Sequence, residues 1–373
     1  MHIASIPLVR PAEVHSRRWP VISGPTIDSL RSLRDVFGAA LRRWAPAPST
    51  GHYAFHYENI LGTSFELQVV AAHPDVAVRA EAAALSEVDR LEQILSGYAA
   101  TSEMAGWQAT YGEDVPVSVE MAEVLGAAEA WRLRTSGAFD PAAVSLVEML
   151  GETGDSAAGA LRDDVARRHT VAVRIRELNK PLWSVDGTRG TARRLTRLAI
   201  SLDGLAKGYI VDRAAARARA VDGVSQVLVN IGGDLRHHGG RAIAVGVADP
   251  RAPAENAPPI AVVRIRDAAL ATSGGYRRGF VVNGRRVSHI LDPRIGRPAE
   301  RIASASVLAP DCAIADALST AFSVMAPDES VALADTLDGV GCLLVESDGT
   351  ITTNVTWNEH AVSPRQDTTH RRL

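Results

Sequence analysis

Apolar residues recur along this chain with the periods of helices and strands. Over residues 75–95 they return every three to four positions, which predicts an amphipathic helix. Asp75 follows Pro74 and is expected to cap this helix. Over residues 52–71 apolar and polar residues alternate around Gly62, which predicts a strand, a turn and a strand.

The same two periods predict the remaining elements. Further helices are expected at 117–133, 205–220, 313–325 and 330–337, and further strands at 170–175, 198–202, 226–230, 341–346 and 350–354. Asn283-Gly284 between apolar runs predicts a β-hairpin over 281–287, because Asn-Gly favours a type I′ turn. Strands and helices do not alternate regularly, so the expected fold class is α+β.

Both ends of the chain differ from its middle. Residues 1–50 are rich in Pro and Arg and end in a linker-like run, which predicts an N-terminal extension of unknown role. Residues 51–357 are expected to form one domain. Residues 358–373 are polar and are expected to be a loose C-terminal tail.

Composition narrows the function classes. The chain has 373 residues with 40 Lys+Arg and 43 Asp+Glu, a net charge of −3, and this balance argues against a general nucleic-acid binder. Hydrophobic residues make up 46%, as in a globular protein. No stretch approaches the roughly 20 apolar residues of a membrane span, and no signal peptide or lipid-modifiable cysteine is seen, so a cytoplasmic location is expected. Cys312 and Cys342 are expected to be buried small hydrophobes.

The segment Ser201-Leu-Asp-Gly-Leu-Ala-Lys-Gly-Tyr209 could bind a phosphate. Its small residues precede a predicted helix, whose first N–H groups favour an anion, and Lys207 adds a positive charge. The spacing matches neither a dinucleotide fingerprint nor a Walker A loop. A purely structural turn is the alternative.

Asp316, Ser319 and Thr320 stand at i, i+3 and i+4 of a predicted helix, so they share one face. One carboxylate with two hydroxyls suits Mg²⁺ that also binds water and substrate phosphates. The alternative is an ordinary solvated face.

Three further residues could carry chemistry. His289 ends a predicted strand and could act as a general base, or it could be a hydrogen-bonded turn histidine. Tyr98 could stack on a flavin or adenine ring, or simply pack. Asp140, in the Gly137–Pro141 loop, could bind a ring edge or ribose hydroxyls.

Taken together, these segments resemble the ApbE family of FAD:protein FMN transferases. The shared motifs occur in one order over about residues 52–355: Leu-Gly-Thr (61–63), Tyr98, Ser-Gly-Ala-Phe-Asp-Pro (136–141), the 201–209 loop, Val-Asn-Ile-Gly-Gly-Asp-Leu (229–235), Ala-Thr-Ser-Gly-Gly-Tyr-Arg-Arg (271–278), His-Ile-Leu-Asp-Pro-Arg-Ile-Gly-Arg-Pro (289–298) and Ala-Asp-Ala-Leu-Ser-Thr-Ala (315–321).

The resemblance implies a fold and an activity. The fold would be a single α+β flavin transferase domain over residues 51–357, with mixed, mainly antiparallel sheets, packed helices and a T-fold-like element. The enzyme would use Mg²⁺ to move the FMN moiety of FAD onto a Ser or Thr hydroxyl of a target protein through a phosphoester bond, releasing AMP. Its partners would be FAD and that acceptor protein, with no nucleic acid and no membrane span.

The resemblance also implies site residues. Tyr98 would stack on the flavin nucleotide, Lys207 would lie near the phosphates, and Leu291 would contact FAD through its backbone. The flavin pocket would be lined by Leu61, Ala138, Phe139, Asp140 and Ser201. The metal would be bound by the Gly204 backbone oxygen, Asp316, Ser319 and Thr320. Lys207 and His289 would be catalytic.

Two positions depart from the family pattern. Ser201 stands where the family usually has Asp, and Gly275 stands where it has Asp or Asn. The first change replaces a carboxylate by a hydroxyl, and the second leaves no polar side chain. Two alternatives therefore stay open: an FAD-binding or flavin-storage protein without transfer activity, and an FAD pyrophosphatase that gives FMN and AMP.

Overall fold

An eight-stranded sheet forms the centre of the fold. The computed structural model describes residues 51–152, 165–252, 257–275, 279–282, 285–288 and 291–362. Every pair of neighbouring strands in this sheet is antiparallel. In sheet order the strands are β1 (Gly51–Ile60), β2 (Thr63–Ala71), β6 (Val224–Ile231), β7 (Asp234–Gly239), β10 (Ala269–Ser273), β15 (Ile302–Ala309), β16 (Gly341–Glu346) and β17 (Ile351–Thr353). With the helices packed on it, this sheet confirms the α+β class.

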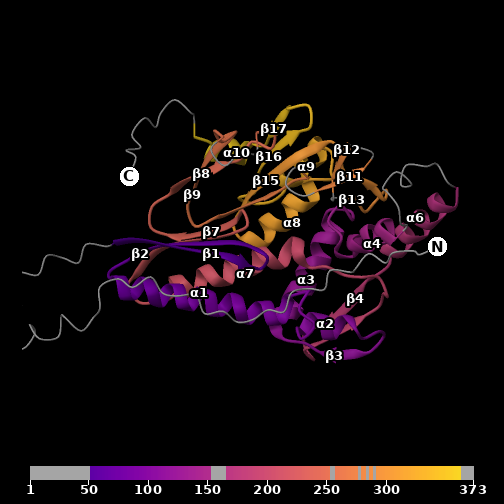
Figure 1. Ribbon diagram of the computed structural model, residues 1–373, viewed down its shortest axis with the longest axis horizontal. Helices are drawn as coiled ribbons and strands as arrows, with labels where there is room; N and C mark the ends of the chain where they lie inside the picture. Colours follow the sequence, from indigo (N-terminus) through magenta and orange to yellow (C-terminus); the bar gives the residue numbers. More distant parts are fainter. Residues whose placement is uncertain are drawn as a thin grey trace, which may run out of the picture. The chain divides into compact units, whose positions relative to one another are not determined.

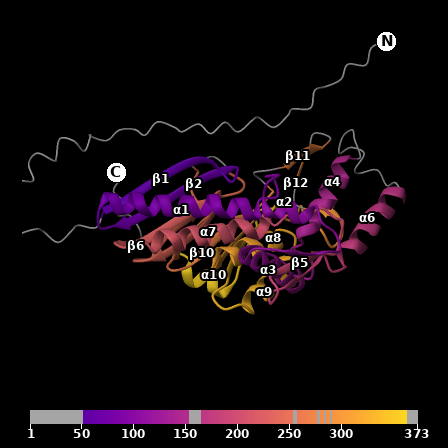
Figure 2. The same ribbon diagram turned by 90° about the horizontal axis from the view of Figure 1, so that it is seen from below.

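The two faces of the sheet bury different clusters, because successive strand residues point to opposite faces. Ala269 and Ala271 of β10 face the main core, whereas Leu270 between them faces a smaller one. The helices α1 (Pro74–Leu95), α7 (Asp203–Arg219) and α8 (Cys312–Phe322) cover the main core, and α1 and α7 run side by side (Figure 2). The hairpin of β8 (Ile243–Val247) and β9 (Ala261–Ile265), with α10 (Val355–His360), covers the smaller core (Figure 1).

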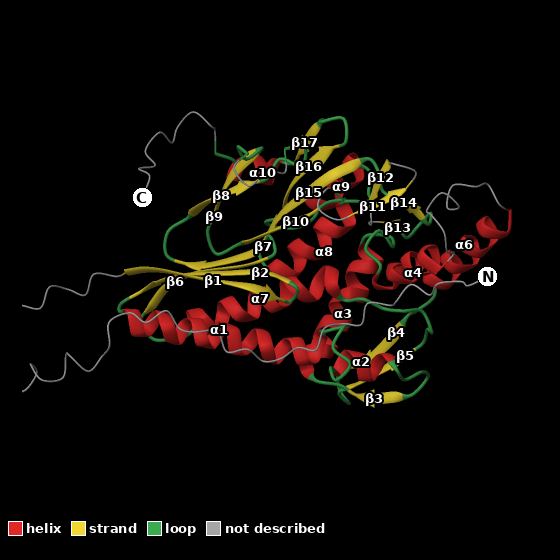
Figure 3. Ribbon diagram, viewed as in Figure 1, coloured by secondary structure: helices red, strands yellow, loops and turns green. Residues whose placement is uncertain are grey.

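A smaller sheet lies beside α2 and α3 (Figure 3). Its strand order is β3-β5-β4, and the edge-to-face contact of Trp107 and Trp183 joins it to α2. These elements are β3 (Asp114–Pro116), β4 (Trp183–Asp186), β5 (Thr191–Arg194), α2 (Glu103–Gln108) and α3 (Val119–Arg134). The others are η2 (Pro141–Ala143), α4 (Val144–Glu152), α6 (Val165–Leu178), β11 (Gly279–Val282), β12 (Arg285–Ser288), β13 (Leu291–Asp292), β14 (Arg297–Pro298) and α9 (Pro327–Asp335).

Most predicted elements are confirmed. The opening hairpin is β1–β2, and the predicted helices are α1, α3, α7, α8 and α9. Val282 pairs with Arg285, which confirms the strands of the predicted hairpin, while Asn283 and Gly284 lie outside the described residues. Cys312 and Cys342 are buried and unpaired by a disulfide, as expected.

The predicted strand at 170–175 is wrong, because these residues belong to α6. Its Val and Ile residues favour a strand locally. In the helix, however, Val171 and Ile175 stand at i and i+4 on one face, and both pack against Gly296. Tertiary contact therefore outweighs the local preference.

The predicted strand at 198–202 is also absent, since the segment is a loop. Leu198, Ile200 and Leu202 are buried as an alternating pattern requires. The backbone N–H groups bind elsewhere: Ile200 N–H donates to Gln108 Oε1 at 3.0 Å, and Ser201 N–H donates to the Pro141 carbonyl at 2.8 Å. Without a neighbouring strand the segment forms no ladder.

Two predicted boundaries are corrected. His73 is the N-cap of α1, with Pro74 next, and Asp75 instead forms an ion pair of 2.8 Å with Arg79. At the other end, α10 continues to His360 and Ala361 forms a bridge with Val263, so residues 358–361 are not a loose tail. Residues 1–50 lie outside the described part of the chain. In the part that is described, no helix combines the length and the hydropathy of a membrane span.

Candidate active site

The predicted phosphate loop leads into the first turn of α7. The Ser201 N–H binds the Pro141 carbonyl, which ties this loop to the loop that contains Asp140. The Ser201 hydroxyl accepts a hydrogen bond of 3.2 Å from the Asp203 N–H, next to the start of the helix. Ser201 therefore has a local structural role, whatever else it binds.

Lys207 projects from α7 between two carboxylates. Its Nζ contacts the Asp234 carboxylate and lies 3.8 Å from Asp316 Oδ1, while the two carboxylate side chains are 2% and 4% exposed. Burial opposes the charged form of Lys207, but the two carboxylates outweigh it and raise its pKa. Burial, with the nearby Asp234 charge, raises the pKa of Asp316 to about 8. Lys207 is thus favoured as a cation beside two buried acidic side chains.

Asp234 belongs to this cluster although the sequence assigned it no role. It begins β7 directly after the turn at Gly232 and Gly233, and it is 1% exposed. Burial raises its pKa, and the contact with Lys207 opposes that rise. The one signal in the sequence was its place in the family motif Val-Asn-Ile-Gly-Gly-Asp-Leu (229–235).

The predicted metal ligands meet where α7 packs against α8. In an α-helix the Gly208 N–H points at the Gly204 carbonyl. Here it donates to Asp316 Oδ2 at 3.1 Å, so this carboxylate lies beside that carbonyl. A Cβ built on Gly204 would lie 3.1 Å from Thr320 Oγ1, a crowded contact, so glycine lets the hydroxyl come this close to the backbone without crowding. Gly204, Asp316 and Thr320 therefore bring three kinds of oxygen together.

Ser319 lies one position before Thr320 but is more enclosed. It is fully buried, and its hydroxyl donates to the Asp316 carbonyl at 3.0 Å. The same hydroxyl shares a hydrogen bond of 2.8 Å with Ser273 of β10. Ser273 also lies 3.5 Å from Thr320 Oγ1. This network holds the Ser319 hydroxyl toward the sheet.

The oxygen set fits a hard cation that takes its remaining ligands from water and phosphate. It holds one carboxylate, a backbone carbonyl and hydroxyls. In the described ranges, no group of three or more His, Cys, Asp or Glu side chains could hold a metal. The set by itself is therefore too small for an all-protein metal cage.

The 136–141 loop borders this corner from α3. Ala138 and Phe139 are each 3% exposed, and the Phe139 ring approaches Gly204. Asp140 caps η2 by accepting the Ala142 N–H at 2.8 Å. Burial raises the pKa of Asp140 to about 6, although Arg132 opposes this from 4.0 Å.

Tyr98 stands over the start of α7. The residue is 86% exposed, and its hydroxyl donates a hydrogen bond of 2.8 Å to Asp203 Oδ2. A ring with an exposed face is available for stacking. The hydrogen bond holds the ring at Asp203, which precedes Lys207 by four residues in α7.

Two further predicted site residues, Leu61 and Leu291, lie in or beside turns. Leu61, with φ +50°, lies in the β1–β2 turn, and the neighbouring Ser64 carbonyl accepts the Gly232 N–H at 3.0 Å. Leu291 begins β13 and is 8% exposed. Arg294, in the turn after β13, donates to the Val324 carbonyl just beyond α8. His289 lies outside the described residues.

This arrangement matches a known family. The ApbE family model matches residues 61–344. The chain belongs to the ApbE family. A Treponema pallidum relative named FAD:protein FMN transferase is 31% identical over 316 residues, which are 78% of this chain and 84% of that protein. A Rhodobacter capsulatus relative of the same name is 32% identical over 248 residues, 64% of this chain but only 45% of that protein.

Solved ApbE structures share the fold. The crystal structure of the ApbE protein from Thermotoga maritima matches 84% of this chain and all of that chain, with a TM-score of 0.72 and 30% identity. The Pseudomonas stutzeri flavinyl transferase ApbE matches 83% of this chain with a TM-score of 0.67 at 24% identity. The single α+β domain expected from the sequence is therefore confirmed as an ApbE fold.

Proposed function

We propose that this protein is an FAD:protein FMN transferase that uses Mg²⁺. It moves the FMN moiety of FAD onto a Ser or Thr hydroxyl of an acceptor protein and releases AMP. The observation that carries the proposal is the cluster of Lys207 with the buried Asp234 and Asp316, beside Gly204 and Thr320. The names of the relatives support the same activity.

The metal would be held by the Gly204 carbonyl, Asp316 and Thr320, with Ser319 behind them. Bound there, Mg²⁺ would neutralise charge on the pyrophosphate of FAD. Lys207 binds a pyrophosphate oxygen as a point charge, and Asp234 keeps its ammonium in place. These groups act where negative charge grows as AMP leaves.

The flavin nucleotide would lie over the start of α7. Tyr98 stacks on it, and Ser201 and Asp140 bind its polar edge. Leu61 and Leu291 close the ends of the pocket. The buried residues Ala138 and Phe139 support its floor beside Gly204.

In the transfer step the acceptor hydroxyl oxygen attacks the phosphorus of the FMN half. The bond from this phosphorus to the AMP phosphate oxygen breaks, and AMP leaves as an anion. His289 takes the hydroxyl proton as general base. His289→Ala should slow transfer while FAD binding is kept; an unchanged transfer rate excludes His289 as the base.

One assay tests the proposal against its alternatives. The protein is incubated with FAD, Mg²⁺ and a threonine-containing acceptor peptide, with a Thr→Val peptide as control. A fluorescent peptide and an equal amount of AMP support transfer. FMN and AMP without labelled peptide indicate a pyrophosphatase, and bound FAD without products indicates storage. The cytoplasmic location remains a prediction.

A further inference from the structure

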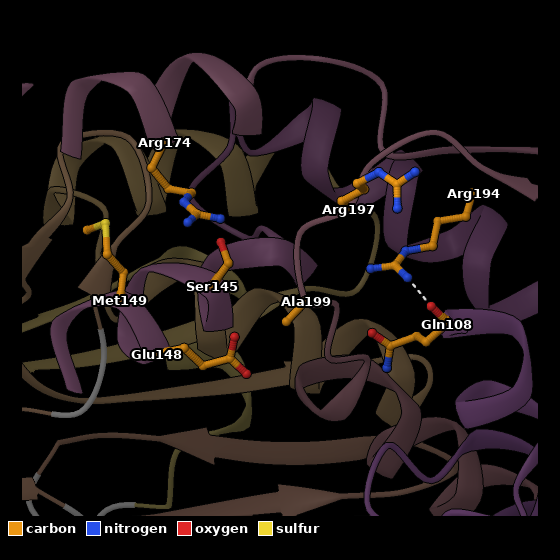
Figure 4. Close-up of a pocket in the computed structure, with 8 residues that line it drawn as sticks. All are labelled: Gln108, Ser145, Glu148, Met149, Arg174, Arg194, Arg197 and Ala199. Carbon is orange, nitrogen blue, oxygen red and sulfur yellow. Dashed lines mark hydrogen bonds between the residues drawn. The ribbon is translucent and has the colours of Figure 1, made fainter. Parts of the chain in front are cut away.

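A cavity away from the Lys207 cluster is lined by residues of α2, α4, α6 and the loop after β5. Its volume is about 330 Å³, and three arginines enter it: Arg174, Arg194 and Arg197 (Figure 4). Glu148 is the one carboxylate among its lining residues, so the lining has a positive charge in excess. None of the ion pairs in the described ranges joins Glu148 to these arginines. Among the lining residues, arginines therefore outnumber carboxylates by three to one.

Arg194 is the buried member of this group. It is 9% exposed; its guanidinium donates to the Gln108 carbonyl and, at 2.6 Å, to the Leu198 carbonyl. Its Nε is buried and has no hydrogen-bond partner among the described residues. An unpaired buried donor costs free energy unless an acceptor binds it.

The other arginines surround the same space. Figure 4 shows Arg197 beside Arg194, and Arg174 reaching in from α6. Burial, with the charge of Arg197, lowers the pKa of Arg194. Two like charges this close are stabilised by an anion between them. The only ion pair of Arg174 in the described part is a loose one, 3.9 Å from Glu177.

Gln108 adds neutral donors to this wall. Its Oε1 accepts the Ile200 N–H at 3.0 Å, which turns the amide NH₂ toward other partners. Gln108 lines the cavity with the arginines. Guanidinium forks with amide donors match the oxygens of phosphate or carboxylate.

We propose that this cavity binds a small oxyanion with at least two negative charges, such as a phosphate group or a polycarboxylate. The cavity lies near the lower limit of about 300 Å³ for small-molecule sites, so a small ligand fits it better than a chain segment. Its wall continues directly into the active-site loop, because Leu198 and Ile200 precede Ser201. Because the oxyanion would bind the folded protein and not the unfolded chain, it is expected to raise the midpoint of thermal unfolding.

Calorimetric titration of the full chain tests this. Inorganic phosphate, AMP and citrate are titrated at constant ionic strength into the wild type and into Arg174→Gln/Arg197→Gln. Arg194 stays in place because it supports two backbone carbonyls. The control, Arg176→Gln/Arg193→Gln, removes the same charge from residues that do not line the cavity.

We expect one-site binding of at least one of these anions by the wild type and the control, and binding about 10-fold weaker or more in the cavity variant. Tighter binding of AMP than of phosphate, with the same arginine dependence, would identify a nucleotide as the source of the phosphate. The proposal is overturned if the wild type shows no saturable binding up to about 10 mM. It is also overturned if the cavity variant binds like the control, since the anion then sits elsewhere, for example at Lys207. Urea unfolding of each variant confirms that all are folded.

Discussion

The ammonium of Lys207 contacts the carboxylate of Asp234, 27 positions further along the chain. This contact joins α7 to the start of β7, and Asp316 of α8 lies 3.8 Å from the same ammonium. One cation thus holds together the three elements on which the proposed phosphate chemistry depends.

Replacing Asp234 by Asn should therefore affect both the fold and the reaction. The buried pair loses one charge, so the free energy of unfolding should fall by about 1–3 kcal/mol in urea titration. The Lys207 ammonium loses its anchor, so the transfer rate should fall about 10-fold or more. Asp114→Asn removes an equivalent charge from the exposed pair with Arg193 and should change neither quantity. Equal unfolding midpoints for the two variants would contradict the pairing.

Local periodicity predicted most helices and strands, but not which of them lie next to each other in the fold. The alternating pattern and the apolar stripe gave β1, β2 and α1, because each depends on residues close in sequence. The strand order that places β6 beside β2 depends on contacts over more than 150 positions. Val171 and Ile175 show the same limit, since only their packing on Gly296 selects a helix.

The site was predictable in part for a similar reason. Helical spacing alone places Asp316 and Thr320 on one side of α8. Their meeting with Gly204 depends on the close contact of α7 and α8, and only the family resemblance indicated it. Asp234 was missed, because an acidic residue after two glycines is typical of a solvated turn, and its burial becomes visible only in the folded sheet.

The contact between α7 and α8 gives a test of the fold. A Cβ on Gly208 would overlap the Cys312 carbonyl, so Gly208→Ala should push the helices apart. We expect a loss of unfolding free energy of about 1–3 kcal/mol, as for other overpacked sites. Gly126→Ala is the control: Gly126 lies in α3 with no atom near its Cβ position, and the change should stabilise the protein by about 0.5–1 kcal/mol. If Gly208→Ala unfolds at the same midpoint as the wild type, α7 and α8 can move apart at this contact without a loss of stability.

Tyr98 separates a stacking role from a hydrogen-bonding role. Tyr98→Ala removes the ring, and KM for FAD should rise about 10-fold, as expected for the loss of one stacked base. Tyr98→Phe keeps the ring and loses the hydrogen bond to Asp203, so KM should change by less than about 3-fold. Neither change should alter the unfolding midpoint, because the residue is 86% exposed. If Tyr98→Phe raises KM for FAD as much as Tyr98→Ala does, the hydroxyl and not the ring is needed for FAD binding.

The proposed Mg²⁺ dependence of transfer should be sensitive to a substitution in α8. Chelation with EDTA should abolish transfer, and Mg²⁺ should restore it. Thr320→Val keeps the shape but removes the hydroxyl beside Gly204, so the Mg²⁺ concentration for half-maximal transfer should rise about 10-fold. Thr336→Val removes a hydroxyl that donates to the Leu333 carbonyl on α9, and should leave the Mg²⁺ titration unchanged. Transfer that persists in EDTA would exclude the metal.

Asp212 should make stability depend on pH, with a sign that the structure fixes. Its carboxylate accepts the N–H groups of Cys312 and Ala313 at the start of α8. Burial raises its pKa to about 6; the nearby Asp311 adds to this rise, while the two N–H groups and Arg236 oppose it. The unfolded chain has a pKa near its ordinary value of about 3.9.

Between about pH 4 and pH 6 the folded protein therefore holds a proton that the unfolded chain has released. Stability from this group is fully present below about pH 4 and falls as the pH rises through 6, by about 3 kcal/mol in total. Asp212→Asn cannot titrate, so the wild type should lose stability relative to this variant over that range in urea unfolding at stepwise pH. For Asp75 the comparison should have the opposite sign. Arg79 lowers the pKa of the exposed Asp75, so the wild type should gain stability relative to Asp75→Asn as the pH rises. Parallel curves for the wild type and Asp212→Asn would mean that the Asp212 carboxylate is no harder to ionise in the folded protein than in water.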